Sequence, residues 1–520
     1  MEETILPMTT KIMLTIILLA LISLVIRACD ALILKPRRLR SLLRKQGIGG
    51  PPPALLVGNI LQMNKARSQV PKQPQGGGGV VHNCVSFLFH ALEQWAKQYG
   101  PSFMFSLGNI QFLHMNDPDV VKEISICTSL EFGKPSCEHK LLGPLLGQGI
   151  ISSNGSLWAH QRKIIGPMFT MDSVKGMMRL MVEPAKTLVS RWTSQIESEG
   201  GVVADIAVDE HMIGFSTEVI SRACFGSNYS EAEEIFLNIR HLQENMIERS
   251  LYLGIPIFRY IPTKSNRETR RLEKKIRALV LKVAQSRKQA TTQNEDIFQT
   301  IVEGSEKKSA LGLDSGDRFI VDNFKNIYLA GYETAAVSAA WTLMLLATNP
   351  EWQDIARAEV LEVCGGQDPD PDMVRKMKIL TMVINESLRL YPPVPQLVRE
   401  AFRDLHFGDV EVPKGVSTWT IVASLHQDPQ IWGPDAHVFN PERFANGVSG
   451  SCNQPHVYMP FGAGPRVCLG QHFAMAELKI LLAFILSNFA FTLSPKYRHS
   501  PVQKLVLMPE FGVHLLVRKL

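Results

Sequence analysis

The sequence contains little cysteine for its length. Its 520 residues include eight cysteines, and no two of them are spaced as C-x-x-C. This scarcity excludes a dense disulfide scaffold and a zinc module of the usual spacing. A reducing compartment fits this cysteine content best. The spacing of the cysteines does not by itself exclude a small number of disulfide bonds.

Excess basic charge is confined to the N-terminus. The net charge is +6, but the first 50 residues hold eight Lys and Arg against three Asp and Glu, whereas the remainder holds 47 against 46. Binding to a phosphate backbone needs an extended basic surface. We therefore expect no nucleic acid among the partners of this chain.

Nucleotide-binding motifs are missing as well. The chain has no P-loop, and the GQG string at residues 147–149 lacks both the third glycine and the strand–helix unit of a dinucleotide fold. A redox reaction on this chain would therefore need electrons from a separate protein.

The composition is that of a globular protein. Apolar residues make up 45% of the chain and charged residues 20%, which is enough for a large buried core. Length alone allows about three domains. Polar, glycine-containing stretches at residues 71–79 and 303–316 predict surface loops. Neither separates regions of different composition, so we expect one large domain over residues 54–520.

A long apolar run lies near the N-terminus. Residues 12–26 carry no charge, and the mostly apolar stretch extends back across Lys11. A membrane-spanning helix needs about 20 such residues, and Lys11 can extend its amine to the interface. Glu2 and Glu3 precede the run and basic residues follow it, so the following side should stay cytosolic. A cleaved signal peptide is the alternative, but an uncleaved anchor over residues 1–34 fits these flanks better.

A basic and proline-rich segment follows the anchor. Residues 35–53 contain six Lys and Arg and end in GGPPP, which predicts a hinge of flexible glycine joined to stiff proline. With this topology the sequons at Asn154, Asn228 and Asn385 face the cytosol and would be accidental.

Helical periodicity dominates the remainder. The clearest helix spans residues 317–348, about 48 Å, and ends before Asn349-Pro350. It is apolar on most faces and should be buried. The predicted strands are short and cover residues 103–106, 111–115, 416–422, 505–508 and 512–517. The sequence thus predicts a mainly α-helical protein with a minor β-sheet.

One cysteine stands in an unusual setting. Residues 461–470, FGAGPRVCLG, place Cys468 between glycines and just before a helical pattern. Glycines let the backbone approach a flat ligand, and the helix that follows favours a thiolate. Cys468 is therefore a candidate iron ligand, although a lone cysteine in such a turn is more often a small buried side chain.

The full string F-x-x-G-x-R-x-C-x-G resembles the haem-binding signature of the cytochrome P450 family, and Gly464 and Gly470 are its glycines. The resemblance implies that Cys468 is the proximal thiolate ligand of haem b. It also implies that Arg466 meets a haem propionate and that Phe461 packs near the sulfur. The expected fold is the cytochrome P450 fold with an N-terminal transmembrane helix.

Two further motifs occur in the order that this family shows. Glu386 and Arg389 lie at i and i+3 of a helix. Alone, such a pair is usually a surface contact worth under about 1 kcal/mol, but it resembles the family's E-x-x-R motif. Arg443, in the string PERF, resembles its partner. The resemblance implies that the three side chains form a buried ion network that locks the haem-binding loop.

The long helix contains the string AGYET at residues 330–334. A glycine inside a helix costs about 1 kcal/mol of stability relative to alanine, so the presence of Gly331 calls for a structural or functional explanation. The string resembles the family's A/G-G-x-D/E-T motif. This implies that Gly331 opens the helix for dioxygen, that Thr334 donates a hydrogen bond where oxygen is activated, and that Glu333 helps to relay protons.

Other candidate cofactor contacts follow from the same resemblance. Trp158 and Arg162 match the W-x-x-x-R motif that holds a propionate, and Arg399 falls where many members carry another propionate contact. His160 faces elsewhere on its helix, and we expect it to be a satisfied surface or core histidine.

The resemblance implies a membrane-bound monooxygenase on the endoplasmic reticulum, single-pass with a cytosolic catalytic domain. Such an enzyme inserts one oxygen atom from O2 into a hydrophobic small molecule, using electrons from NADPH-cytochrome P450 reductase. Thiolate ligation promotes O–O cleavage. A P450-fold isomerase or dehydrase and a non-catalytic haem-binding scaffold are the alternatives, and the pair Glu333 and Thr334 disfavours both.

Several segments resemble a plant clan that oxidises gibberellins, cytokinins, brassinosteroids and other terpenoids, including residues 220–230 and 262–267. Residues 158–165, 221–226 and 493–502 are most similar to its gibberellin-oxidising branch. We therefore expect hydroxylation or epoxidation of a gibberellin or related diterpenoid acid. By family analogy its pocket would draw on residues 129–153, the first half of the long helix, residues 394–398 and the area of Phe511.

Overall fold

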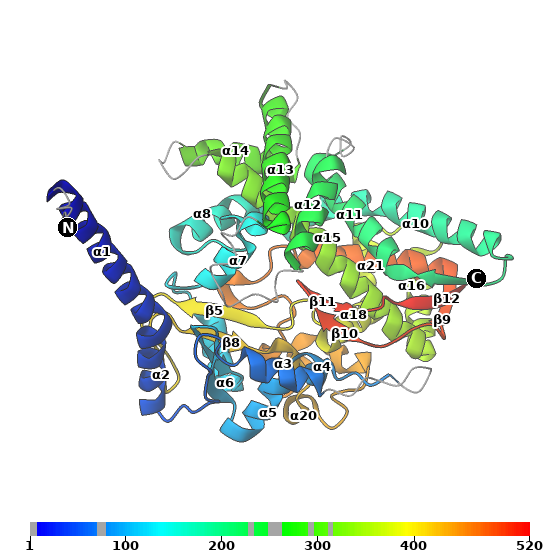
Figure 1. Cartoon of the computed structure of the whole chain (residues 1–520). Coiled ribbons are helices and arrows are strands. Elements are labelled where there is room, and N and C mark those ends of the chain that lie inside the picture. The colour runs from blue at the N-terminus through cyan, green and yellow to red at the C-terminus, as the bar shows by residue number, and fades with distance from the viewer. Residues whose placement is uncertain (1–7, 70–79, 227–232, 248–262, 290–295, 310–315) are drawn as a thin grey trace.

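The computed structural model describes residues 8–69, 80–226, 233–247, 263–289, 296–309 and 316–520. The described chain is mostly helical and carries small sheets, which confirms the expected fold class (Figure 1). The α-helices are α1 (Met8–Cys29), α2 (Lys35–Lys45), α3 (Ile60–Ser68), α4 (Cys84–Leu88), α5 (His90–Tyr99), α6 (Pro118–Ile126), α7 (Ser136–Leu146), α8 (Gly155–Ile165), α9 (Met171–Met177), α10 (Arg179–Ser198), α11 (Val208–Phe225), α12 (Glu233–Ile247), α13 (Lys264–Gln289), α14 (Ile297–Ser309), α15 (Gly316–Thr348), α16 (Pro350–Cys364), α17 (Pro371–Lys376), α18 (Lys378–Leu390), α19 (Val422–His426), α20 (Pro429–Trp432) and α21 (Gln471–Asn488).

The strands are β1 (Ser102–Leu107), β2 (Ile110–Met115), β3 (Phe132–Gly133), β4 (Ala204–Ala207), β5 (Leu397–Ala401), β6 (Leu405–Phe407), β7 (Val410–Val412), β8 (Ser417–Thr420), β9 (Phe489–Leu493), β10 (Pro501–Gln503), β11 (Leu507–Pro509) and β12 (His514–Lys519). The largest sheet has the order β1-β2-β8-β5-β3, with β2 and β8 parallel and its other pairs antiparallel. The two predicted C-terminal strands lie in different sheets, because β11 pairs with β10 whereas β12 lies between β4 and β9.

The predicted long helix is α15. It has 33 residues, ends before Asn349-Pro350 as predicted, and is buried along most of its length. Ala330, Gly331 and Thr334 interrupt this burial near its middle. A long helix of a globular domain is buried on all sides only where other elements surround it, so these three positions mark where α15 borders an accessible space.

The prediction of a loop over residues 303–316 is wrong for residues 303–309. Residues 303–309 continue α14, and residues 310–315, like residues 71–79 of the other predicted loop, lie outside the described residues. Helix α14 persists because Ile297, Phe298 and Ile301 are fully buried. This apolar face holds the helix against the core even though its other side is polar.

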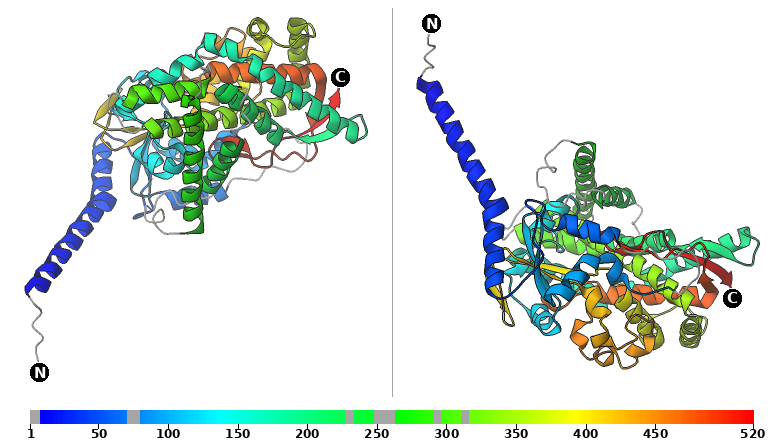
Figure 2. Two further views of the ribbon diagram at one scale, coloured as in Figure 1. Left: turned by 90° about the horizontal axis from the view of Figure 1, so that it is seen from above. Right: turned by 60° about the horizontal axis from the view of Figure 1, so that its bottom comes forward.

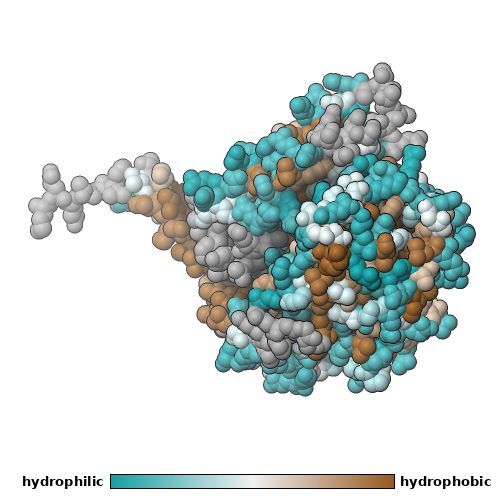
Figure 3. Space-filling model, turned by 90° about the vertical axis from the view of Figure 1, so that its right-hand side faces the viewer, coloured by the Kyte–Doolittle hydropathy of each residue, from teal (hydrophilic) through white to brown (hydrophobic). Residues whose placement is uncertain are grey.

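The N-terminal helix projects from the domain (Figures 1 and 2). The span from Thr10 to Lys45 is long and apolar enough to cross a membrane, and none of its most apolar stretch is buried inside the protein. Figure 3 shows hydrophobic side chains along this projection. Helix α15 passes the same length and hydropathy test, but 83% of its stretch is buried, as expected of a core helix.

The segment predicted to be a hinge is instead packed on the sheet. Residues 35–45 form α2, which follows α1 through a π-helical turn, Asp30–Leu34. Buried Arg40 donates hydrogen bonds to the Pro51 carbonyl (3.0 Å) and the Ser106 hydroxyl (3.3 Å). Gly50 lies so close to β1 that a Cβ there would be 1.9 Å from the Met104 carbonyl oxygen. Glycine at this position serves a close backbone approach, and the segment is not free to swing.

Leucine 43 offers a test of this packing. Leu43 is fully buried, whereas its neighbour Leu42 is 40% exposed. We expect Leu43→Ala to lower the free energy of unfolding by about 2 to 5 kcal/mol because it leaves a cavity. Leu42→Ala should change it by less than about 1 kcal/mol. Urea unfolding of the purified protein measures both, and equal small effects would restore the hinge interpretation.

Candidate functional site

The loop that carries Cys468 is held by backbone contacts. The Cys468 amide donates to the Phe461 carbonyl (2.8 Å). Gly464 has φ +68°, and a Cβ there would lie 1.7 Å from the Ser125 carbonyl oxygen at the end of α6. Only glycine combines this backbone conformation with so close an approach. Helix α21 begins directly after Gly470.

The Cys468 side chain is accessible although protein surrounds it. The side chain is exposed, yet desolvation by the surrounding protein raises the pKa of its thiol above the ordinary value. The Gly470 amide and Arg162 act in the opposite direction. Both observations hold if the sulfur borders an internal space and is not packed in the core. A metal cation in that space would stabilise the thiolate.

Two guanidinium groups flank Trp158 beside this loop. Arg466 lies 4.4 Å from the centre of the Trp158 ring, and Arg162 lies 5.9 Å from it. Arg466 also donates to the Ser153 carbonyl and the Asn154 side-chain oxygen, both at 3.0 Å. Arg162 donates to the Val467 carbonyl at 2.7 Å. The structure thus brings Trp158, Arg162 and Arg466 together with the cysteine loop.

Arg399, on β5, completes a cluster of positive charge. Burial lowers its pKa. Burial also lowers the pKa of Arg466 to about 10, with Arg399 and Arg162 adding repulsion. Within the described residues, none of these three arginines forms an ion pair with a carboxylate. Arg399 and Ala463 line one pocket between α6 and the sheet. Clustered positive charge without a counter-charge is unfavourable, so these three partly buried arginines favour an anionic ligand.

The cysteine, the glycines and the arginines therefore fit haem b. An accessible thiol matches an iron ligand, and Gly464 lets the loop that carries it pack closely on α6. The unpaired arginines match the two propionate groups of haem. Phe461 is half-buried at the base of the same loop.

The Asn154 side chain connects Arg466 of this cluster to Lys134, and the sequence analysis did not identify this role. Its side chain accepts from the Lys134 amide (2.7 Å) as well as from Arg466, and donates to the Lys134 carbonyl (2.9 Å). The sequence identified Asn154 only as a sequon, and these bonds occupy the amide that a glycan would need. The sequon at Asn228 lies outside the described residues.

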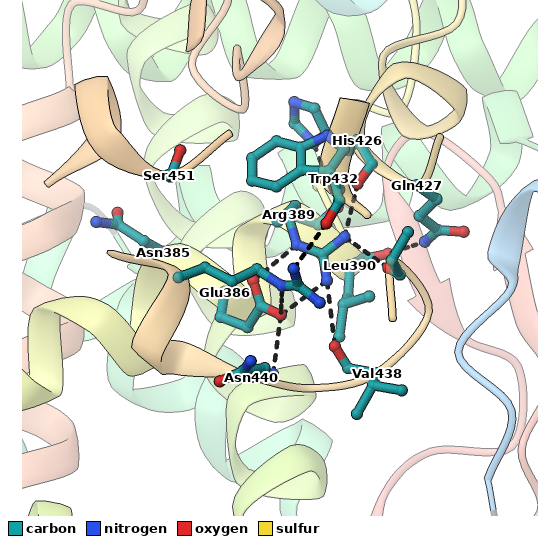
Figure 4. Close-up of polar contacts among 12 residues, drawn as sticks. Asn385, Glu386, Arg389, Leu390, His426, Gln427, Trp432, Val438, Asn440 and Ser451 are labelled. Atoms are coloured by element: carbon teal, nitrogen blue, oxygen red, sulfur yellow. Dashed lines mark hydrogen bonds and ion pairs between the residues drawn. The ribbon is translucent and has the colours of Figure 1, made fainter. Parts of the chain in front are cut away.

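Glu386 and Arg389 form a buried bidentate pair on α18 (Figure 4). Both contacts measure 2.7 Å, and both side chains are fully buried. The remaining guanidinium hydrogens of Arg389 point to backbone carbonyls, at 2.7 Å for His426 and Ala436 and 3.3 Å for Val438. Each buried donor and acceptor is therefore matched, as such a pair requires.

Arg443 contributes less directly than predicted. Its Nε lies 3.5 Å from Glu386 without forming a hydrogen bond. Its nearest charge is Asp435, at 2.5 Å, and it donates to the carbonyls of Trp432 (2.8 Å) and Asp435 (2.7 Å). Arg443 lowers the pKa of Asp435 by this contact. The sequence did not identify Asp435, because its acidic side chain belongs to no recognised motif.

His426 links the ion pair to the cysteine loop. Its Nδ1 lies 3.2 Å from the Arg389 carbonyl, and its Nε2 accepts from the Met459 amide at 3.0 Å. Burial lowers the pKa of His426 to about 3, so the ring is neutral. Met459 precedes Phe461 by two residues, so α18 positions the start of the loop through this imidazole.

The α15 motif divides into two sides. The Thr334 hydroxyl lies on the accessible side and donates to the Ala330 carbonyl at 2.7 Å. Glu333 points into the protein and accepts from Gln243 of α12 at 2.6 Å. The Tyr332 hydroxyl donates to the same Gln243. Burial raises the pKa of Glu333 to about 7. Gln243 was missed because its helix is distant in sequence.

Gly331 has a packing reason that the sequence did not suggest. A Cβ there would lie 2.7 Å from Ile220 of α11. The glycine therefore permits close contact between α11 and α15, which accounts for its presence without a role in dioxygen access.

His160 also differs from expectation, because its Nε2 is buried and lacks a hydrogen-bond partner in the described structure.

Breaking the buried pair should release the cofactor. Arg389→Ala or Glu386→Ala leaves one buried charge unpaired, and we expect a loss of about 3 to 5 kcal/mol and of most bound haem. Arg375→Ala is the matched control, because Arg375 pairs with Asp372 at i and i+3 on the surface. It should cost under about 1 kcal/mol. Haem per polypeptide and urea unfolding measure both, and normal haem in Arg389→Ala would contradict this role.

The contact between α11 and α15 can be tested by a double-mutant cycle. Gly331→Ala should cost about 1 to 3 kcal/mol by overpacking, although alanine favours helix. In an Ile220→Ala background the same substitution should cost little, because the Cγ1 and Cδ1 atoms that the new methyl group would meet are gone. Equal costs in both backgrounds, measured by denaturant unfolding, would remove Ile220 as the reason for Gly331.

Comparison with known proteins agrees with this geometry. The family model described as Cytochrome P450 matches residues 78–517. "Cytochrome P450 714C2" of Oryza sativa subsp. japonica is 46% identical over 493 residues, which is 94% of each chain. "Cytochrome P450 714B2" of the same plant is 45% identical over 92% of this chain and 91% of its own. "Cytochrome P450 714A2" of Arabidopsis thaliana is 42% identical over 92% of this chain and 93% of its own. The chain belongs to the cytochrome P450 family and is a haem-dependent monooxygenase.

Proposed function

We propose that this enzyme inserts one oxygen atom from O2 into a gibberellin or related diterpenoid acid, by hydroxylation or epoxidation. Electrons come from NADPH-cytochrome P450 reductase. The enzyme acts at the endoplasmic reticulum membrane, with residues 1–34 as a single-pass anchor, residues 35–53 as the connection and residues 54–520 as a cytosolic catalytic domain. The exposed apolar helix α1 supports the anchor.

The observation that carries the reaction type is the accessible Cys468 beside unpaired arginines, together with the Glu333 and Thr334 pair. When bound, haem supplies oxygen activation, which thiolate ligation promotes. Cys468 would hold the iron, and Arg162, Arg399 and Arg466 would hold the propionates. These roles rest on the matching motifs and on the lack of carboxylate partners for the arginines.

Glu333 and Thr334 are suited to moving protons. The pKa of Glu333, about 7, lets its carboxyl both hold and release a proton near neutral pH. The Thr334 hydroxyl lies on the accessible side of α15, one residue further along the helix. An isomerase or dehydrase would need neither group, which supports the monooxygenase over these alternatives.

The substrate proposal rests on resemblance to the gibberellin-oxidising branch. Part of the expected pocket is fastened to the first half of α15: the amides of Ile150 and Ile151 donate to Asn323 (2.9 Å) and Asn326 (2.8 Å). Phe511 instead has Arg498 over its ring at 4.3 Å. Another plant hormone or terpenoid, such as a cytokinin, brassinosteroid or triterpenoid, is the second candidate.

Spectroscopy and product analysis test this function together. The reduced protein with carbon monoxide should show the thiolate-haem band, and Cys468→Ala should lose it. Cys452→Ala, at a partly buried cysteine outside the loop of residues 461–470, should keep it. With reductase, NADPH and oxygen-18 gas, a gibberellin panel should yield products that carry one labelled atom. Products formed without NADPH, or without label, would reject the monooxygenase reaction on these substrates.

A further inference from the structure

Residues 146–151 are bound to α15 along their backbone. Three of their amides donate to side chains of the helix at 2.8 to 2.9 Å, and Asn326 donates in turn to the Leu146 carbonyl at 2.8 Å. All three acceptor side chains are buried, and burial requires such groups to be matched. The amides are those of Gln148, Ile150 and Ile151, and their respective acceptors are Asp322, Asn323 and Asn326.

Two glycines allow the segment to come so close to the helix. A Cβ at Gly147 would lie 2.1 Å from the Asp322 carboxylate, and a Cβ at Gly149 would lie 2.6 Å from the Asn326 side chain. Gly147 also has φ +57°, a conformation that favours glycine. Contact with α15 therefore accounts for the GQG string, which matches no nucleotide-binding motif.

A glutamine of α8 holds the other side of the same segment. Gln161 is 1% exposed. Its amide nitrogen donates to the Gln148 carbonyl at 2.8 Å, and its oxygen accepts from the Ser153 hydroxyl at 2.6 Å. Residues 147–153 are thus clamped between α15 and α8, the helix that carries the W-x-x-x-R motif.

The end of this segment determines where Arg466 lies. Its Nη2 donates to the Ser153 carbonyl and to the Asn154 side-chain oxygen, both at 3.0 Å, and the guanidinium carbon lies 4.4 Å from the centre of the Trp158 ring. Two acceptors on one nitrogen and an aromatic face fix the plane of the group. Among the described residues the guanidinium group makes no other hydrogen bond, so its Nε and Nη1 are left for a ligand.

We infer that residues 147–154 form a bracket that presents the guanidinium group of Arg466 to a haem propionate. Gln161 and Asn326 are the positioning residues of this bracket. Neither side chain needs to touch the cofactor, because each acts through the backbone that supplies the acceptors of Arg466. A guanidinium group that is already held in place loses less conformational freedom when it binds a carboxylate. The inference concerns the cofactor site and does not depend on the identity of the substrate.

The alternative is that these bonds only stabilise the fold. Gln353 offers the comparison, because it is also a buried glutamine that joins separate parts of the backbone. It donates to the Leu346 carbonyl at 3.2 Å and to the Phe491 carbonyl at 2.9 Å. These contacts join α16 to α15 and β9, away from the cysteine loop and the arginine cluster. Loss of Gln353 should therefore lower stability without changing the haem site.

The test measures how firmly the full-length, haem-loaded enzyme holds its cofactor. Gln161→Leu and Asn326→Leu should each transfer haem to apomyoglobin about tenfold faster than the unchanged enzyme. They should also shift the midpoint potential of the iron to more negative values, because a cation held beside haem favours the ferrous state. Gln353→Leu should lower the free energy of unfolding and leave both quantities unchanged. In an Arg466→Lys background, Gln161→Leu should add less than about twofold, because its effect passes through Arg466.

A milder variant keeps the inference testable if the leucine variants hold no haem. Ser153→Ala removes only the bond to Gln161 and should show a smaller change of the same sign. Unchanged haem transfer and midpoint potential in Gln161→Leu, Asn326→Leu and Ser153→Ala would overturn the inference. An equal change in Gln353→Leu would overturn it as well, as would a full further effect of Gln161→Leu in the Arg466→Lys background.

Discussion

The buried ion pair between Glu386 and Arg389 is the contact on which the geometry of the site depends. It consumes every hydrogen bond that the guanidinium group can make, and most of those bonds end on backbone carbonyls of residues 426–438. His426 extends the same network to Met459, just before the cysteine loop. Removal of either partner of a buried ion pair is strongly destabilising. The position of Cys468 is therefore coupled to α18, because the loss of any one of these bonds would leave a buried polar group without its partner.

The site also contains an excess of positive charge that an anionic ligand would neutralise. Arg162, Arg399 and Arg466 converge without carboxylate partners in the described structure, and burial, with added repulsion from Arg399 and Arg162, lowers the pKa of Arg466. Folding thus places positive charge where it is unfavourable in the empty protein. Binding of haem, with its two propionate groups, would offset that cost and would link cofactor binding to stability.

Local motifs identified candidate residues that the structure brings together, such as Trp158, Arg162 and Arg466. Contacts between residues far apart in the sequence could not be identified in this way. The strings around Cys468, Glu386 and Thr334 are contiguous, so the sequence located them. Gln243, Asp435 and Asn154 act through partners far along the chain or belong to no motif, and nothing near them in the sequence identifies these partners. The predicted hinge failed for a similar reason. Its glycines and prolines permit flexibility, but Leu43 and Arg40 pack against a strand that comes about 60 residues later.

The continuity of α1 and α2 has a consequence for how the enzyme meets a membrane. With α1 in a bilayer, one helix extends to Lys45 and packs on the sheet without a flexible joint. Each residue added to or removed from this helix would turn the domain by about 100° about the helix axis and shift it by about 1.5 Å. Helical phase therefore sets which face of the domain lies against the lipid.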